Sequence, residues 1–249
     1  MVSGKYSALA GAISREQTIA NISANLANIN TTGYKSSLLS FESVLQGAQQ
    51  SDNTRGIDFS RIKNSFTDFT PGAMRPTERP LDMAISGDGF FKLMGSDGLL
   101  YTRRGDFTMD AGGLLTTSNG LSVLDAQGAQ IYIPDIDGGK VAVGDNGMIY
   151  ILDRLDNREE VAQLAVVNIT DKLKLKREKD TTFSLGNDTA AVSSDNYRVI
   201  QGHLELSNVN MTSEMAKMID SHRIFETYHK VLKSFATISE QQDELGTVA

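Results

Sequence analysis

The sequence contains no cysteine, and this absence excludes several kinds of site. A disulfide framework, a thiolate metal site and a cysteine nucleophile all require that residue. A chain without cysteine fits a protein that leaves the cytoplasm, but cytosolic proteins can lack cysteine as well. The composition therefore limits the chemistry more than it limits the compartment.

Long apolar runs are absent too, which argues against a membrane-spanning helix. The first residues, MVSGKYSALAGAISREQ, lack the cationic segment and the apolar core of a secretory signal, so we expect no cleaved signal peptide. Basic residues are outnumbered, with 24 Lys and Arg against 31 Asp and Glu, and no long basic run could neutralise a phosphate backbone. Nucleic acid is therefore disfavoured as a partner.

Proline and glycine are scarce near the amino terminus, where the sequence has a helical pattern. Between Lys5 and Ile29 there is no proline and a single glycine, Gly11, while apolar residues recur every three or four positions. The pattern predicts a helix that is ended by the turn residues Asn30 to Gly33.

The carboxyl-terminal block, from Leu206 onward, has no proline and only one glycine, Gly246. Its apolar residues keep a spacing of three or four and predict a second long helix. Asn208 or Asn210 is the expected N-cap. The residues that define this spacing are Met211, Met215, Met218, Phe225, Tyr228, Leu232 and Phe235.

The middle of the chain reads as β structure. Short runs such as FFKLM, LLYTR, LSVL, AQIYI, MIYIL and VAQLAVVNI alternate with turn sequences such as DAGG, TSNG, DAQG and GDNG, which predicts hairpins in a meander or small barrel. We therefore expect an α+β fold with terminal helical segments at 1–40 and 206–249, an extended linker region at 41–80 that includes the polar loop QGAQQSDNTRG, and a central β-rich domain at 81–205.

Catalytic chemistry finds little support in the sequence. Three histidines, His203, His222 and His229, belong to the last fifty residues without an HExxH pattern, and there is no phosphate-binding or dinucleotide-binding glycine motif. DIDGGK at Asp135 begins like a calcium loop but lacks the third ligand and the distal Glu, so a turn explains it better. We expect no catalytic, metal or cofactor site and no small-molecule substrate.

The segment from Gln17 to Tyr34 has no charged side chain, and Asn21, Asn25 and Asn28 form one polar stripe on the predicted helix. Two interpretations stay open. The stripe could face water on an amphipathic helix, or the helix could be surrounded by other helices, where a buried Asn fixes register and partner. The missing Lys and Glu favour the second interpretation.

One chain of this length cannot easily surround both terminal helices and also fold a β domain. Other subunits would then cover the helices, and a contact between different faces of successive copies generates a helical polymer when its rotation does not close. Two other classes stay possible, a secreted hydrolase on a β scaffold and a monomeric binding module with ordered ends.

Three stretches resemble the axial proteins of the bacterial flagellum, in particular the rod proteins of the basal body. They are NISANLANINTTGYKSS, then RPLDMAISGDGFFKL with YTRRGDFTMDAGGLLTTSNGLSVL, and QGHLELSNVNMTSEMAKMIDSHRIFETYHKVL. Together they cover about a third of the chain, and they occur in the family's order. The opening SGKYSALAGAISREQ and the segment VAQLAVVNITDKLKLKREKDTTFSLG look like the proximal-rod F type more than the distal-rod G type or the longer hook protein, although residues 155–191 match the family only loosely.

The resemblance implies a non-enzymatic structural subunit of the rod that crosses the periplasm. Its partners would be copies of itself, other rod proteins and the flagellar type III export apparatus, with no insertion into the membrane. The terminal helices would pair as a coiled coil in an inner layer, with the β domain outside. The expected assembly interface comprises Asn21, Ile22, Asn25, Leu26, Asn28, Ile29, Asn208, Asn210, Met215, Met218, Phe225 and Leu232.

Overall fold

The structure is a computed structural model of the whole chain. It describes residues 2–46, 57–96, 98–134, 139–153, 157–179, 181–186, 191–193 and 196–247. The chain divides into two compact units. Unit 1 comprises residues 1–28, 36–68 and 209–249, and unit 2 comprises residues 29–35 and 69–208.

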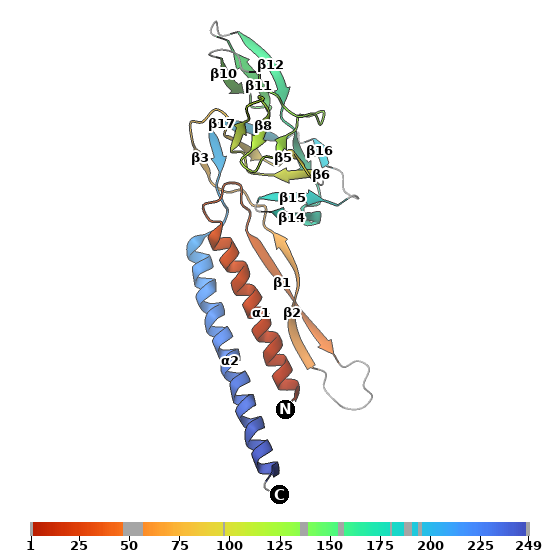
Figure 1. Cartoon of the computed structure of the whole chain (residues 1–249), viewed down its shortest axis with the longest axis vertical. Helices are drawn as coiled ribbons and strands as arrows, with labels where there is room; N and C mark the ends of the chain where they lie inside the picture. The colour runs from red at the N-terminus through yellow and green to blue at the C-terminus, as the bar shows by residue number, and fades with distance from the viewer. Residues whose placement is uncertain are drawn as a thin grey trace. The chain divides into compact units, whose positions relative to one another are not determined.

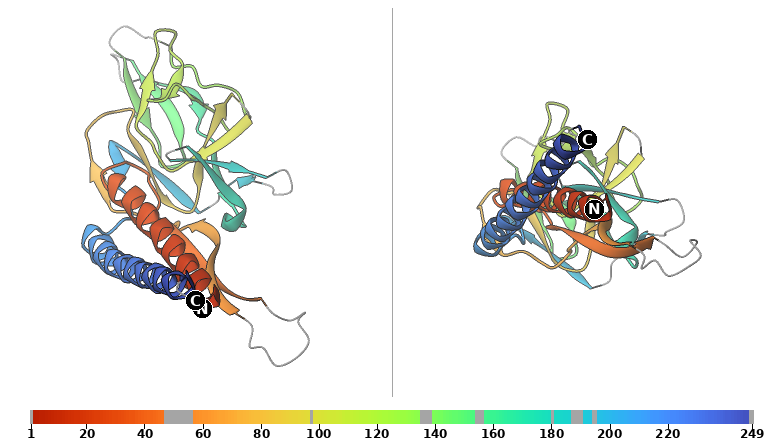
Figure 2. Two further views of the ribbon diagram at one scale, coloured as in Figure 1. Left: turned by 60° about the horizontal axis from the view of Figure 1, so that its bottom comes forward. Right: turned by 90° about the horizontal axis from the view of Figure 1, so that it is seen from below.

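Unit 1 contains the two predicted helices, α1 (Val2–Ala27) and α2 (Met211–Thr247). They lie side by side and run in opposite directions, as Figure 1 shows and as the two further views in Figure 2 confirm. Asn210 caps α2, because its Oδ1 accepts a hydrogen bond from the Ser213 amide at 3.0 Å. The prediction of a long helix at each end of the sequence is confirmed.

A β-hairpin completes unit 1. Strand β1 (Ser37–Gln46) pairs antiparallel with β2 (Ile57–Thr67), with a bulge between Ser40 and Phe41. The region 41–80, where we expected an extended linker, contains most of this hairpin, because the runs SLLSFESVLQ and IDFSRIKNSFT pair with each other. Most of the predicted polar loop between these strands lies outside the described residues.

Unit 2 is built from short strands, and every pairing between its described strands is antiparallel. The main sheet has the order β14-β15-β6-β5-β9-β8-β7, and β13 also pairs with β5. The strands are β3 (Met74–Pro76), β4 (Met83–Gly87), β5 (Phe90–Gly95), β6 (Gly98–Thr102), β7 (Phe107–Met109), β8 (Leu115–Thr117), β9 (Ser122–Val123), β10 (Lys140–Val143), β11 (Met148–Leu152), β12 (Arg158–Gln163), β13 (Val166–Ile169), β14 (Leu175–Lys179), β15 (Thr182–Leu185), β16 (Ala191–Ser193), β17 (Tyr197–Gln201) and β18 (His203–Glu205), with the short 3-10 helix η1 (Lys172–Lys174) before β14.

Two of the predicted strands differ from the structure. AQIYI forms only isolated bridges, in which Gln130 pairs with Leu124 and Tyr132 with Leu114. VAQLAVVNI is divided between β12 and β13, because the Leu164 amide donates to Gly147 O and the Ala165 amide donates to Leu124 O. Because of these bonds the run does not form one continuous strand. The hydrophobic pattern alone does not indicate this break.

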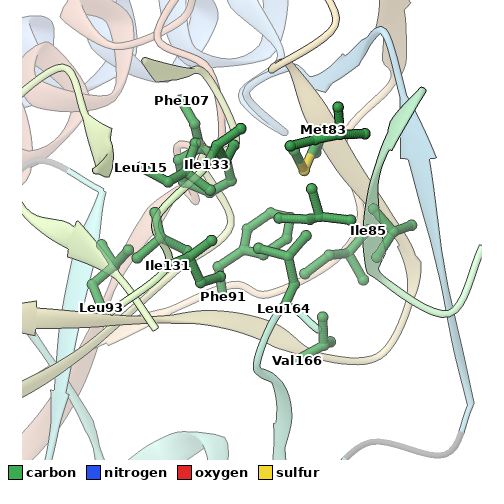
Figure 3. Packing of buried hydrophobic residues seen from close by; sticks show 14 residues of the cluster. Met83, Ile85, Phe91, Leu93, Phe107, Leu115, Ile131, Ile133, Leu164 and Val166 are labelled. Atoms are coloured by element: carbon green, nitrogen blue, oxygen red, sulfur yellow. The ribbon is translucent and has the colours of Figure 1, made fainter. Parts of the chain in front are cut away.

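The core of unit 2 follows from the side-chain alternation of β5. Phe91 and Leu93 belong to the larger hydrophobic cluster, which also includes Met83 and Phe107 and is shown in Figure 3. Phe90 points to the opposite face and packs in a second cluster with Phe183. A strand whose successive side chains face opposite sides can serve two cores when both sides are covered.

Glycines occupy the predicted turn centres of unit 2. Gly113, Gly120 and Gly147 have φ angles of 81°, 78° and 80°, in the left-handed region that favours glycine. The DAGG turn is further fixed by Asp110, whose Oδ1 accepts from the Gly112 and Leu114 amides. The backbone geometry of these turns explains the glycines.

No helix within the described part of the chain is long and apolar enough to cross a membrane. Asp135, where the sequence begins like a calcium loop, lies outside the described residues. Among the residues that are described, no group of three His, Cys, Asp or Glu side chains could hold a metal ion.

Candidate functional site

The two helices of unit 1 meet along a seam in which small residues face aromatic ones. A Cβ added to Gly4 would lie 3.3 Å from Phe235 Cζ, and one added to Gly11 would lie 2.5 Å from Tyr228 Cζ. The missing side chains on α1 therefore make room for the rings of α2. Because the second pair lies seven residues further along α1 and seven residues earlier along α2, the two contacts share one antiparallel register.

The same register continues to Asn25 and Glu214, the third pair of this seam. Asn25 is 1% exposed, and its Nδ2 donates to Glu214 Oε2 at 3.3 Å and to Ser37 O at 3.0 Å. Its Oδ1 accepts from the Ser37 amide at 2.9 Å. Lys217 completes the arrangement by donating to Glu214 Oε1 at 2.6 Å. Asn25 thus joins α1, β1 and α2 within one chain.

The other predicted interface residues separate into several environments. Asn28 Nδ2 donates to Ala24 O in its own helix, and Asn208 Nδ2 donates to Thr70 Oγ1 and O in unit 2. Along α2, Met218, Phe225 and Leu232 are half-buried, whereas Met215 is exposed. Among the predicted residues of α1, Ile22 is buried, and Asn21 and Leu26 are half-buried. Ile29, which follows α1 and belongs to unit 2, is half-buried as well.

Both helices expose apolar side chains away from this seam. On α1, Tyr6, Leu9 and Ile13 are 63%, 44% and 46% exposed, and exposed alanines continue this outer α1 stripe at Ala20, Ala24 and Ala27. An outer α2 stripe is formed by Met211, Met215 and Ile219, spaced four residues apart and each about half exposed. Single exposed apolar residues are ordinary, but a stripe along a helix marks a surface that another helix can cover.

A groove of about 310 Å³ lies between α1, β1 and α2 in unit 1. It is lined by mostly apolar side chains from β1 and by mostly polar or charged ones from the helices. The lining includes Arg15, Thr18, Asn21, Leu39, Phe41, Lys217, Asp220, Ser221 and Ile224. Asn21 therefore lines an open groove. Asn25, four residues later, also lines this groove but is almost completely buried.

Unit 2 contains a buried cluster of charges that the sequence reasoning missed. Lys35 Nζ lies 2.5 Å from Glu205 Oε1, and both side chains are almost completely buried. Arg103 Nη1 lies 3.6 Å from the other oxygen of Glu205, an ion pair without a hydrogen bond. Burial lowers the pKa of Arg103, and the charge of Glu205 works in the opposite direction. Two cations therefore share one buried carboxylate.

The Arg103 guanidinium is held mainly by main-chain groups. It donates to Ile85 O at 3.2 Å and to Gly87 O at 2.8 Å, and it lies 5.3 Å from the centre of the Phe90 ring. Arg177 plays a similar part beside Lys35, because its Nη2 donates to Lys35 O and its guanidinium stacks over the Tyr34 ring at 4.7 Å.

The sequence did carry a signal for this cluster. Lys35 ends TTGYK, Arg103 stands in YTRRGDF and Glu205 stands in GHLELSN, so each of the three stretches that resemble rod proteins supplies one charge. Nothing in their spacing indicated that the three side chains meet, because only the folded chain brings positions so far apart together.

Comparisons with known proteins match these same regions. Residues 6–35 match the family model described as flagella basal body rod protein, residues 84–151 match the flagellar hook protein FlgE/F/G D1 domain, and residues 200–242 match the flagellar basal body rod FlgEFG protein C-terminal region. Two helical ends around a β-rich middle, matched in this order, define an axial structural subunit of the flagellar rod and hook.

Similarity to individual proteins extends over nearly the whole chain. The basal-body rod protein FlgF of Escherichia coli is 32% identical, with 92% of each chain covered, and FlgF of Caulobacter vibrioides is 31% identical over 95% of this chain and 96% of its own. FlgG of Bacillus subtilis is 28% identical over 97% and 98%. The chain belongs to the flagellar basal-body rod protein family of the FlgF and FlgG type.

Proposed function

We propose that this chain is a structural subunit of the proximal part of the flagellar rod, the F type, and that it has no enzymatic activity. It polymerises helically with copies of itself and with other rod proteins to form part of the hollow drive shaft. It reaches the periplasm through the flagellar type III export apparatus without a cleaved signal. The 32% and 31% identities to two FlgF proteins support the F type, while FlgG proteins that are 28% and 30% identical keep the distal rod as the alternative.

The observation that carries this proposal is the pair of outer stripes in unit 1. A single copy leaves Tyr6, Leu9 and Ile13 about half exposed to water, and covering their remaining apolar surface would stabilise an assembly at about 25 cal/mol for each Å² buried. The outer α2 stripe lies on a different helix, so a contact between the α1 stripe of one copy and the α2 stripe of the next joins two unlike surfaces. Contacts of that kind can extend without closing.

The helices of each copy pair as a coiled coil within this scheme. Gly4 with Phe235, Gly11 with Tyr228, and Asn25 with Glu214 keep one antiparallel register in steps of seven or fourteen residues. A seven-residue repeat of seam contacts is the signature of coiled-coil packing. The buried Asn25 at one end of this repeat would fix the register at some cost in stability, since its amide bonds are satisfied in only one alignment.

The assembly role is tested by making the outer α1 stripe polar. Leu9→Gln together with Ile13→Gln should leave the purified monomer folded, because both side chains are already exposed, and should leave secretion into the medium unchanged. Rod assembly and swimming should be lost. Glu16→Gln, at an exposed position of the same helix, is the matched control and should swim normally. Normal swimming of the double variant would rule out the stripe as an assembly surface.

The F type is tested separately by complementation. The gene for this chain is introduced into two strains of one flagellated bacterium. One strain lacks its FlgF protein, and the other lacks its FlgG protein. We expect swimming to return only in the strain without FlgF. Restoration only in the strain without FlgG would assign the chain to the distal rod instead.

A further inference from the structure

The backbone passes between the two units after residues 28, 35, 68 and 208. Three short segments of unit 2 adjoin these crossings, namely residues 29–35, 69–72 and 205–208. All three are bonded to one another inside unit 2, and Lys35 and Glu205 stand at the centre of these bonds.

Lys35 makes the first set of links. Its Nζ forms the ion pair with Glu205 Oε1 at 2.5 Å and donates to Thr70 O at 2.8 Å. One ammonium group therefore holds a residue from each of the two other segments. Because Lys35 has no exposed surface, water cannot replace either partner without opening the segment.

Glu205 makes the second set. Its Oε1 also accepts from the Gly72 amide at 2.9 Å, and its main-chain oxygen accepts from the Gly33 amide at 2.7 Å. A further bond joins the second and third segments, from Asn208 Nδ2 to Thr70 Oγ1 at 3.0 Å. The segments are thus connected in pairs by bonds that all involve Lys35, Glu205 or Thr70.

We propose that Lys35 and Glu205 form a clamp that ties every chain crossing of unit 2 to one point. Its role is positioning: it makes the segments that continue into α1, the hairpin and α2 move as one body. This inference rests on the proposed function, because a subunit of a drive shaft has to pass load between its β-rich unit and its helices through these crossings. A buried ion pair is well suited to the task, since its geometry is specific. Removing one partner would leave the other charge buried and uncompensated.

A purely stabilising role for the pair predicts something different. If the ion pair only contributed to the stability of unit 2, removing it would loosen the whole unit, including β5 and the hydrophobic core. If it is a clamp, the connecting segments open locally while the core stays closed, and local opening of this kind is visible in amide hydrogen exchange.

The experiment is hydrogen exchange on the full chain with Lys35→Met. We expect the Gly33 and Gly72 amides to exchange at least about tenfold faster than in the unmodified chain, while amides of β5 and β6 change by less than about twofold. Lys172→Met is the matched control, because it removes an exposed ion pair with Asp88 at 2.9 Å in the same unit and should leave Gly33 and Gly72 unaffected. Equal acceleration throughout unit 2, or none at these two glycines, would overturn the clamp.

Glu205→Gln provides a second variant in case Lys35→Met does not fold. The amide keeps the size of the side chain and an acceptor for the Gly72 amide but removes the negative charge. We expect faster exchange at the Gly33 amide, which donates to the Glu205 main-chain oxygen, with the core again protected. Unchanged exchange in this variant would contradict the proposal independently.

Swimming in media of increasing viscosity separates the clamp from the proposed function. Cells with Lys35→Met should build rods and swim in dilute medium, but lose speed more steeply than control cells as the load rises. If the unmodified chain itself fails to restore swimming, the proposed function is wrong. The hydrogen-exchange experiment tests the clamp independently of that result. If the variant swims like the unmodified chain at every viscosity, the role in carrying load is wrong.

Discussion

Asn25 of α1 and Glu214 of α2 are separated by 189 positions in the sequence, yet the amide of one donates to the carboxylate of the other at 3.3 Å. The same amide group bonds both main-chain polar groups of Ser37. Asn25 thus fixes where the two helices and the first hairpin strand meet, and its bonds identify it as a part of the fold of unit 1. Its expected role at a subunit contact stays a prediction.

Asn25→Leu should destabilise unit 1. The substitution leaves the Ser37 amide, the Ser37 carbonyl and one Glu214 oxygen without Asn25, and each buried polar group left unpaired costs about 1–3 kcal/mol. Thermal unfolding followed by helical circular dichroism should shift to lower temperature, because the two described α-helices belong to unit 1. Asn28→Leu is the control, since the Asn28 amide bonds its own helix, and hydrogen exchange in unit 2 should not change in either variant.

Gly11→Leu should force the helices of unit 1 apart. Its Cβ alone would lie 2.5 Å from Tyr228 Cζ, and overpacking of this kind costs about 1–3 kcal/mol. The loss should appear although leucine is a better helix former than glycine. Ala24→Leu, at an exposed position of the same helix, should be tolerated. Equal stability of the two variants in urea unfolding would contradict the close approach of Gly11 to Tyr228.

The antiparallel register predicts which engineered cysteines can pair. Counting seven residues from Gly11 and from Tyr228 gives Thr18 and Ser221, and both line the groove of unit 1. Thr18→Cys with Ser221→Cys should therefore form an intrachain disulfide under mild oxidation, and the natural absence of cysteine makes the product simple to identify. Thr18→Cys with His222→Cys, one residue out of register, should remain reduced. The opposite result, read by mass spectrometry, would disprove the register.

Gly120→Val should destabilise unit 2 through the backbone alone. A Cβ at this position would have nothing within 4 Å, so crowding is not the cause, but φ is 78° and a left-handed conformation costs a residue with a Cβ about 1–2 kcal/mol. Gly186→Val is the matched control, because it also has open space and lacks a positive φ. If both substitutions lowered the melting temperature equally, the turn geometry would not explain Gly120.

Much of the fold could be predicted from local patterns. Helical spacing predicted α1 and α2, and side-chain chemistry limited the cap of α2 to Asn208 or Asn210, of which Asn210 is the cap. Turn sequences contain the glycines at 113, 120 and 147, which have positive φ. Each of these depends on residues that are close in the chain, so the sequence contains the whole cause. The same patterns could not place the hairpin of unit 1, because β1 and β2 stabilise each other and neither run is distinctive alone.

The sequence by itself determined the two terminal helices, the β-rich middle between them and the absence of cysteine chemistry. Only the tertiary structure decided which residues meet, as Lys35 does with Glu205, or Gly11 with Tyr228. The physical reason is that buried charges and close-packed glycines are favourable only in the presence of a specific partner, and that partner is far away in the sequence, 170 positions in the case of Lys35 and Glu205. In the sequence, Lys35 after TTGY has the character of an ordinary surface lysine. Only the folded chain buries it and pairs it with the carboxylate of Glu205.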